Sequence, residues 1–189
     1  MDRSDLSDGL RELYAVLRDR TREQWNRDLP LYELLFDRWE RARENGFGDG
    51  ASIYHSSYVY GDVEVGPNTW IGPHTLLDGS GGLRIGSNCS ISTGVQIYTH
   101  DTVKWAVSGG VAEYEYAPVS IGDSCYLGPQ TVVAKGVTVG DQSVVGACSF
   151  VNRSLPHRSI AVGIPCRVVG HVGQREDGDV ELVIDVQSP

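Results

Sequence analysis

An aliphatic residue recurs at six-residue intervals through most of this 189-residue chain. The interval holds from residue 53 to 77, shifts by two residues at GSGG (79–82), and holds again from 85 to 97 and from 121 to 151. The positions are all Ile, Leu or Val: Ile53, Val59, Val65, Ile71, Leu77, Ile85, Ile91, Ile97, Ile121, Leu127, Val133, Val139, Val145 and Val151. A repeat this regular is typical of a solenoid, in which each turn packs on the next.

The residues between these positions indicate short strands joined by tight bends. A small or β-branched residue often lies four places after the aliphatic one, as at Thr69, Cys89 and Thr131, and a glycine often follows it directly. A helix would instead repeat at three and four residues. We therefore predict inward-pointing aliphatic side chains on strands that form triangular turns of about 18 residues, stacked about 4.8 Å apart. The glycines are expected to give the bends their backbone freedom.

Composition disfavours several classes of protein. The formal net charge of −9 argues against general nucleic-acid binding, which requires a basic surface. No apolar run approaches the roughly 18 residues of a membrane span, and the polar, acidic start does not resemble a secretory signal. Cys89, Cys125, Cys148 and Cys166 show no CxxC spacing, so we expect reduced thiols in a cytoplasmic protein.

The segments on either side of the repeat follow other patterns. Residues 10–25 and 31–45 carry leucines at helical spacing and are predicted to be helices that cap one end of the coil or shape a substrate pocket. The alternation from Val180 to Val186 predicts a further strand. The predicted regions are a helical cap over 1–50, a coil over 51–170 with a projecting loop at 101–120, and a C-terminal extension over 171–189.

The segment IGDSCYLGPQTVVAKGVTVGDQSVVGACSFVNRSLPHRSIAVGIPCRVVG (121–170) resembles the hexapeptide-repeat acyltransferase superfamily, and within it the maltose and galactoside O-acetyltransferases. The resemblance covers about residues 53–170, and VGIPCRVVG is its most specific part. It implies an all-β core in the form of a left-handed parallel β-helix, with an N-terminal α-helical cap and a projecting loop. It also implies acetyl-CoA as acyl donor, no metal, and a homotrimer with sites between subunits.

His100 is the candidate catalytic base. It stands in IYTHD, where the six-residue spacing stops for the loop at 101–120. Imidazole titrates near neutral pH and therefore suits removal of a proton from a hydroxyl or amine. The resemblance places the catalytic histidine of sugar acetyltransferases at this point. Either Asp78 or Asp101 is expected to orient His100 through its other ring nitrogen.

The acceptor is expected to contact Asp78, Asp101 and Trp105. Asp78 matches an acidic segment that contacts the acceptor in sugar acetyltransferases, but only one acid of that segment is present and the asparagine usually found upstream is missing. The resemblance therefore does not imply that this protein acts on simple maltosides or galactosides. Trp105 is one of three aromatic residues in the loop, with Tyr114 and Tyr116, and such rings suit stacking on a sugar.

The resemblance also assigns candidate contacts to CoA. Gly128, Pro129 and Ala147 match positions that line the pantetheine groove, and Pro129 replaces a residue that is often serine. Asn152, Arg153 and Arg167 match positions near the CoA phosphates or adenine. Lys135 and Arg158 are interpreted as solubilising surface charges.

The function expected from these observations is transfer of acetyl from acetyl-CoA to a carbohydrate hydroxyl, in a polysaccharide precursor, within a ternary complex. N-acetylation of a nucleotide-linked amino sugar is the nearest alternative. An acyl-enzyme at Cys148 is less favoured, since nothing nearby in sequence activates it. A γ-carbonic-anhydrase-like site needs three histidines, two of them close in sequence, and no pair among the five in the chain has that spacing. A non-catalytic coil is the last alternative.

Overall fold

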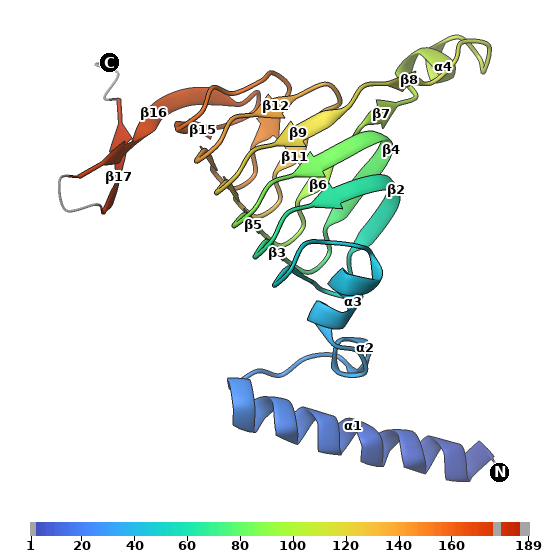
Figure 1. The fold of residues 1–189 in the computed structure, drawn as a ribbon. Coiled ribbons are helices and arrows are strands. Elements are labelled where there is room, and N and C mark those ends of the chain that lie inside the picture. Colours follow the sequence, from blue (N-terminus) through green and yellow to red (C-terminus); the bar gives the residue numbers. More distant parts are fainter. Residues whose placement is uncertain (1–2, 176–178, 186–189) are drawn as a thin grey trace.

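The computed structural model describes residues 3–175 and 179–185 (Figure 1). A helical N-terminal region leads into a coil of stacked strands, from which one arm and a C-terminal hairpin project. The coil consists of the stacked turns that the repeat predicts, and it is the left-handed parallel β-helix that the resemblance implies.

Short parallel strands form three faces. Face 1 contains β1 (Ser52–Ile53), β3 (Trp70–Ile71), β5 (Ser90–Ile91), β10 (Tyr126–Leu127), β13 (Val144–Val145) and β15 (Ser159–Val162). Face 2 contains the first part of β2 (Tyr58–Val65) and of β4 (Leu76–Ile85), with β6 (Gln96–Ile97), β11 (Val132–Val133) and β14 (Phe150–Val151). Face 3 contains the last part of β2 and of β4, with β9 (Val119–Ile121) and β12 (Thr138–Val139). We call the edge between faces 1 and 2 the first corner, and the edge between faces 2 and 3 the second corner.

The inward column of aliphatic side chains forms the core. Thirteen of the fourteen predicted positions are buried, and Val59, in the first turn, is partly buried against the same cluster. Like residues stack on like, since Ile71 pairs with Ile91 and Leu127 with Val145. Burying one such side chain stabilises the fold by about 1.5–3 kcal/mol. The column therefore fixes the register of every turn.

The glycines do not have the role at the bends that we expected. The residue just before each small inward residue takes positive φ, and there it is often not glycine: Asn68, His74, Asn88, Ser124, Gln130, Gln142, Cys148 and Arg158. The glycines directly after the aliphatic residues instead allow close approach between turns. At Gly128, an added Cβ would lie 2.6 Å from the backbone nitrogen of Ala147. These glycines are thus required by contact between turns.

Three helices precede the coil: α1 (Arg3–Trp25), α2 (Leu31–Leu34) and α3 (Arg38–Glu44). Asp37 caps α3 by accepting hydrogen bonds from the backbone N–H groups of Trp39 and Glu40. Ala42 and Phe47 are buried in the core cluster, so α3 and its following turn cover the first turn of the coil. By contrast, α1 stands away from the coil and packs against α2 (Figure 1).

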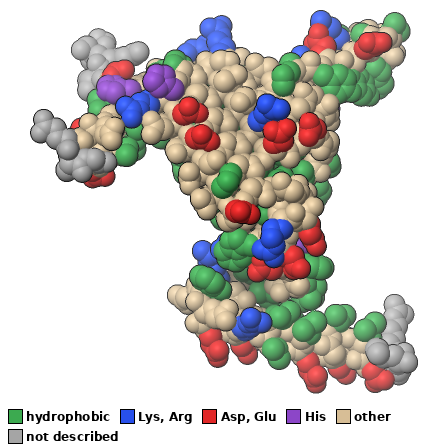
Figure 2. All heavy atoms as spheres, in the orientation of Figure 1, with side chains coloured by type: hydrophobic (Ala, Val, Ile, Leu, Met, Phe, Trp, Pro, Cys, Tyr) green, Lys and Arg blue, Asp and Glu red, His purple; other side chains and the backbone are tan. Residues whose placement is uncertain are grey.

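The arm leaves the coil after β6 and returns at β9. It contains β7 (His100–Asp101), α4 (Val103–Val107) and β8 (Glu115–Tyr116), and β7 pairs with β8 antiparallel. Below it, β6 still pairs with β11, so the excursion leaves the stacking of the turns intact. Figure 2 shows hydrophobic side chains gathered on the arm, where Val103, Trp105 and Val111 are exposed.

The C-terminal extension is a hairpin of β16 (Arg167–Gln174) and β17 (Val180–Ile184), with β16 antiparallel to β15. The predicted strand from Val180 to Val186 is present as far as Ile184, and Val186 lies outside the described residues. Among the described helices, none is both long and apolar enough to cross a membrane.

Candidate active site

The second corner brings together residues that are far apart in sequence. Asp78 follows the face 2 part of β4, His100 follows β6, and Lys135 follows β11. Because these strands pair in register, the residues after them lie above one another along one edge of the coil. His100 also opens the arm, so it stands at the point where the regular surface ends.

Asp78 and His100 are joined directly. The distance from Asp78 Oδ2 to His100 Nδ1 is 2.6 Å. The side chain of Asp78 is 1% exposed, whereas that of His100 is 31% exposed. The buried carboxylate therefore binds the imidazole on its inner side, and part of the ring remains exposed to solvent. Sequence alone left Asp78 and Asp101 as alternatives for this role, and the structure selects Asp78.

The surroundings of Asp78 keep it ionised. Burial alone would raise its pKa, but hydrogen bonds from Ser80, from the backbone N–H of Thr99 and from His100 outweigh burial and lower the pKa to about 2. Thr99 N lies 2.9 Å from Oδ2 and Ser80 N lies 3.0 Å from Oδ1. With both oxygens occupied below the surface, Asp78 does not present itself to an acceptor, which differs from the contact role that we expected for it.

The ionised carboxylate determines the tautomer of His100. A carboxylate only accepts hydrogen bonds, so the Nδ1 of a neutral imidazole facing it carries the proton. The lone pair is then on Nε2. His100 can therefore take a proton from a group placed at Nε2, while Asp78 stabilises the imidazolium that results.

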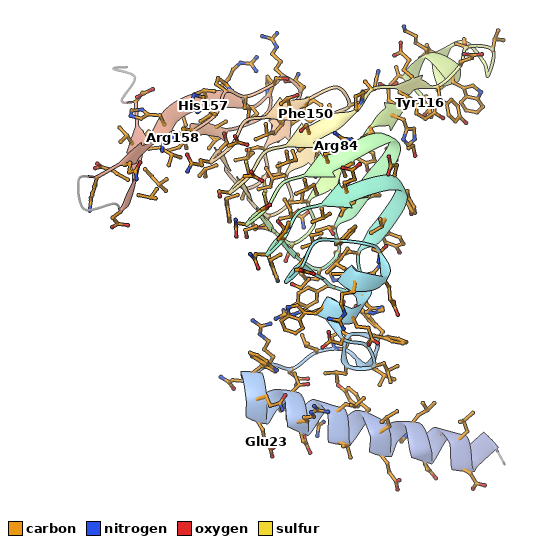
Figure 3. All side chains as sticks on the ribbon, viewed as in Figure 1. Glu23, Arg84, Tyr116, Phe150, His157 and Arg158 are labelled. Atoms are coloured by element: carbon orange, nitrogen blue, oxygen red, sulfur yellow. The ribbon has the colours of Figure 1, made fainter. Side chains whose placement is uncertain are left out.

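Tyr116 covers the other side of His100. The two residues face each other across the β7–β8 pair, with ring centroids 5.8 Å apart and an interplanar angle of 27°. Figure 3 shows Tyr116 at the base of the arm. Trp105 packs edge-on against Tyr114 in the arm, at a centroid distance of 5.7 Å, and its contact with the acceptor stays a prediction. Tyr116, not Trp105, is thus the aromatic residue in contact with His100.

Lys135 ties both strands of the arm to the coil. Its ammonium lies 2.8 Å from Asp101 Oδ2 and 3.1 Å from Glu115 Oε2, and its side chain is 22% exposed. Hydrogen bonds with Lys135 lower the pKa of Asp101, and those with Asp101 and Glu115 raise the pKa of Lys135. Asp101 also accepts a hydrogen bond from Val103 N. Asp101 therefore anchors the arm, and our interpretation of Lys135 as a solubilising charge was wrong.

The candidate CoA contacts lie on both sides of face 2. Pro129 and Ala147 are exposed at the first corner, one turn apart, and Cys148 N donates to the carbonyl of Pro129 at 2.8 Å. Gly128 is buried beside them. Asn152 and Arg153 are exposed at the second corner, after β14.

Arg167 is also exposed, at the start of β16 beside Val162. Its predecessor Cys166 donates its N–H to the carbonyl of Phe150, which places this part of the chain at the C-terminal end of face 2. These candidates thus lie at the two edges and at the C-terminal end of face 2, and His100 lies on the same edge as Asn152 and Arg153.

The cysteines lie apart from the histidine. Cys148 is exposed at the first corner, whereas Cys89, Cys125 and Cys166 are buried. His100 lies at the second corner, so it is not placed to activate Cys148. Within residues 3–175 and 179–185, no three His, Cys, Asp or Glu side chains gather as ligands for a metal ion.

Comparison with known proteins adds to this geometry. Residues 118–153 match the family model described as bacterial transferase hexapeptide (six repeats). The chain is 28% identical to the galactoside O-acetyltransferase of Escherichia coli K12 over 132 residues, which is 59% of this chain and 65% of that protein. The match thus spans less than two thirds of the relative's length.

Solved structures share the fold over a longer stretch. The hexapeptide-repeat acetyltransferase of Vibrio cholerae complexed with acetyl coenzyme A is 26% identical, with a TM-score of 0.57 and 87% of each chain covered. A mutant of AntD, an N-acyltransferase from Bacillus cereus, in complex with dTDP and coenzyme A has a TM-score of 0.60 at 20% identity, over 70% of this chain and 88% of that one. The chain thus has the left-handed β-helix of six-residue repeats, and it resembles the hexapeptide-repeat acetyltransferases.

Proposed function

We propose that the protein is an acetyltransferase that moves an acetyl group from acetyl-CoA to a hydroxyl of a carbohydrate. The observation that carries this proposal is the Asp78–His100 pair at the second corner, with Nδ1 bonded to a buried carboxylate and the ring partly exposed. The similarity to the Vibrio cholerae acetyltransferase, whose structure contains acetyl coenzyme A, supports the donor. Since acetyl-CoA is available in the cytoplasm, we place the reaction there.

The proposed chemistry is direct transfer in a ternary complex. Nε2 of His100 takes the proton of the acceptor hydroxyl as its oxygen attacks the thioester carbonyl. The new C–O bond forms, the C–S bond breaks, and the departing CoA sulfur receives the proton from the imidazolium. Asp78 holds the ring and stabilises its positive charge throughout. This route needs no covalent intermediate at Cys148, which lies at the other corner.

The donor would lie along the edges of face 2, between this chain and the neighbouring subunit that is proposed below. Gly128, Pro129 and Ala147 would line the pantetheine arm, and Asn152, Arg153 and Arg167 would contact the phosphates or the adenine. Arg153 and Arg167 are exposed and form no ion pair with a carboxylate among the described residues, so their guanidinium groups are open to phosphate.

The acceptor class is a carbohydrate, and we favour a polysaccharide precursor. The named function of the Escherichia coli relative, galactoside O-acetylation, supports a sugar hydroxyl. Tyr116 offers a ring beside His100 on which a sugar can pack. A nucleotide-linked amino sugar would meet the same base and the same thioester, so O-transfer and N-transfer must be separated by assay.

We also propose that the protein is a homotrimer that packs through face 2. The outward side chains of that face form a largely apolar row of Tyr58, Leu76, Gln96, Val132 and Phe150. The corresponding row on face 3 is polar and contains Glu64, Arg84, Ser120 and Thr138. A neighbour on face 2 would bury the apolar row and enclose the space beside His100.

Substituting His100→Ala should lower kcat by about a hundredfold to ten-thousandfold, since the general base is lost. Release of free CoA thiol from acetyl-CoA would be measured across nucleotide sugars, amino sugars and simple glycosides. His157→Ala, at an exposed histidine away from the second corner, is the control. Unchanged turnover in His100→Ala would refute the mechanism, and a response to amino sugars alone would favour N-transfer.

Substituting Asp78→Asn should change how stability depends on pH. The folded pKa of about 2 lies below the ordinary 3.8, so ionised Asp78 stabilises the fold above about pH 4, and this contribution is lost as the pH falls toward 2. The difference in free energy of unfolding between native protein and variant should therefore shrink by about 2 kcal/mol between pH 6 and pH 2. Urea denaturation at both pH values measures it. A constant difference would contradict the assigned role.

Lys135→Met should loosen the arm and lower kcat by about tenfold to a hundredfold, because His100 and Tyr116 lose their fixed positions. The matched control is Lys104→Met, which removes a more exposed lysine that contacts Glu115 but not Asp101. Amide exchange in residues 100–116 should rise in Lys135→Met only, and Lys135→Arg should restore activity in part. Equal effects of the two methionine variants would argue against the anchoring role.

Val132→Arg should convert the trimer to monomers, because it places a charge in the apolar row of face 2. Thr138→Arg introduces the same charge on face 3 and should leave the assembly intact. Light scattering gives the molar mass of each variant. If native protein has the mass of a single 20.6 kDa chain, the trimer proposal is wrong.

A further inference from the structure

A pocket of about 430 Å³ lies where the end of α1 meets α2, α3 and the first turn of the coil. This volume falls within the range of small-molecule sites, about 300–1,000 Å³. Its walls include apolar side chains from the helices, among them Leu17, Trp25, Leu34 and Trp39. Tyr54, directly after β1, forms its coil side and is 8% exposed.

Two arginines meet at the same oxygen of this pocket. Arg27 Nη1 and Arg38 Nη1 each donate to the hydroxyl oxygen of Tyr54, both at 3.1 Å. Two cations are thus held within reach of one neutral oxygen. Neither forms an ion pair with a carboxylate among the described residues, although the chain as a whole is acidic.

Contacts within the protein hold the Arg38 guanidinium in place before any ligand binds. The Arg38 guanidinium lies over the indole of Trp39, 4.1 Å from its centroid, and 5.5 Å from the centroid of the Tyr54 ring. These two ring contacts hold the guanidinium in place, and only one of its five N–H donors is used by the Tyr54 hydroxyl. Arg20 adds a third guanidinium to the lining.

Two of the carboxylates that line the pocket accept hydrogen bonds from backbone N–H groups. Glu33 accepts hydrogen bonds from the N–H groups of His55 and Ser56, both at 2.9 Å. Asp37 is the N-cap of α3. Of the acids that line the pocket, only Glu40 has a carboxylate without a hydrogen-bond or ion-pair partner among the described residues, and its side chain is exposed. Glu33, Asp37 and Glu40 thus line the pocket together with the arginines, but among the described residues none of the three forms an ion pair with Arg27 or Arg38.

We propose that this pocket binds a small organic phosphate, with the phosphate between Arg27 and Arg38 and an apolar or aromatic body against the tryptophans. Two converging guanidiniums match a doubly charged phosphate better than a singly charged carboxylate. The site is independent of the proposed transferase reaction, because none of its residues belongs to the second corner or to the candidate CoA contacts.

Calorimetric titration with phenyl phosphate tests this proposal, with inorganic phosphate and benzoate as comparisons that lack the aromatic body or the second charge. Phenyl phosphate should bind more tightly than either. The double variant Arg27→Gln with Arg38→Gln should weaken its binding by about tenfold or more. Arg43→Gln is the matched control, since Arg43 is an exposed arginine of α3 that does not line the pocket.

Circular dichroism establishes that the double variant remains folded, and Tyr54→Phe provides a second variant that keeps both arginines. Tyr54→Phe should bind phenyl phosphate at least as well as native protein, because it removes a competing acceptor. The proposal is overturned if phenyl phosphate does not bind, if benzoate binds equally well, or if the arginine and control variants bind alike. His100→Ala should bind normally, so failure of the transferase proposal would leave this result unaffected.

Discussion

The inward column of aliphatic side chains is the interaction on which the rest of the molecule depends. Because each anchor stacks on its equivalents in adjacent turns, all turns share one register, and residues that follow equivalent strands align at the corners. Asp78 and His100 are 22 residues apart in sequence and 2.6 Å apart in space for this reason. The packing that stabilises the coil is therefore also what assembles the candidate site.

Burial and charge at the second corner act in opposite directions, and the balance gives Asp78 its role. Removing a carboxylate from water favours its neutral form, but the N–H groups of Ser80 and Thr99 and the imidazole more than compensate. The result is a carboxylate that is ionised at neutral pH and lies beside a partly exposed imidazole ring. Lys135 forms a second ionic group nearby, and it holds Asp101 and Glu115 so that the base of the arm stays next to His100.

Sequence reasoning was strongest where the repeat is regular. The fourteen aliphatic positions predicted the core because inward packing forces that spacing, and the break in spacing indicated where His100 stands. The choice between Asp78 and Asp101 depended on the strand pairing around GSGG, where the spacing shifts. The roles of Tyr116 and Lys135 were harder still to predict, because the strand pairing and the ion pairs of the arm do not follow the six-residue repeat. Trp105 was favoured by composition alone.

The continuity of β6 with β11 beneath the arm has a consequence for how such a protein can diversify. Gln96 pairs with Val132 as though the intervening residues were absent, so the ladder bears no trace of the insertion. The arm and the strand ladder of the coil are consequently encoded in separate stretches of the chain. Exchange of residues 102–114 would change the surface beside the histidine, while Asp101 and Glu115 would still hold the base of the arm to Lys135.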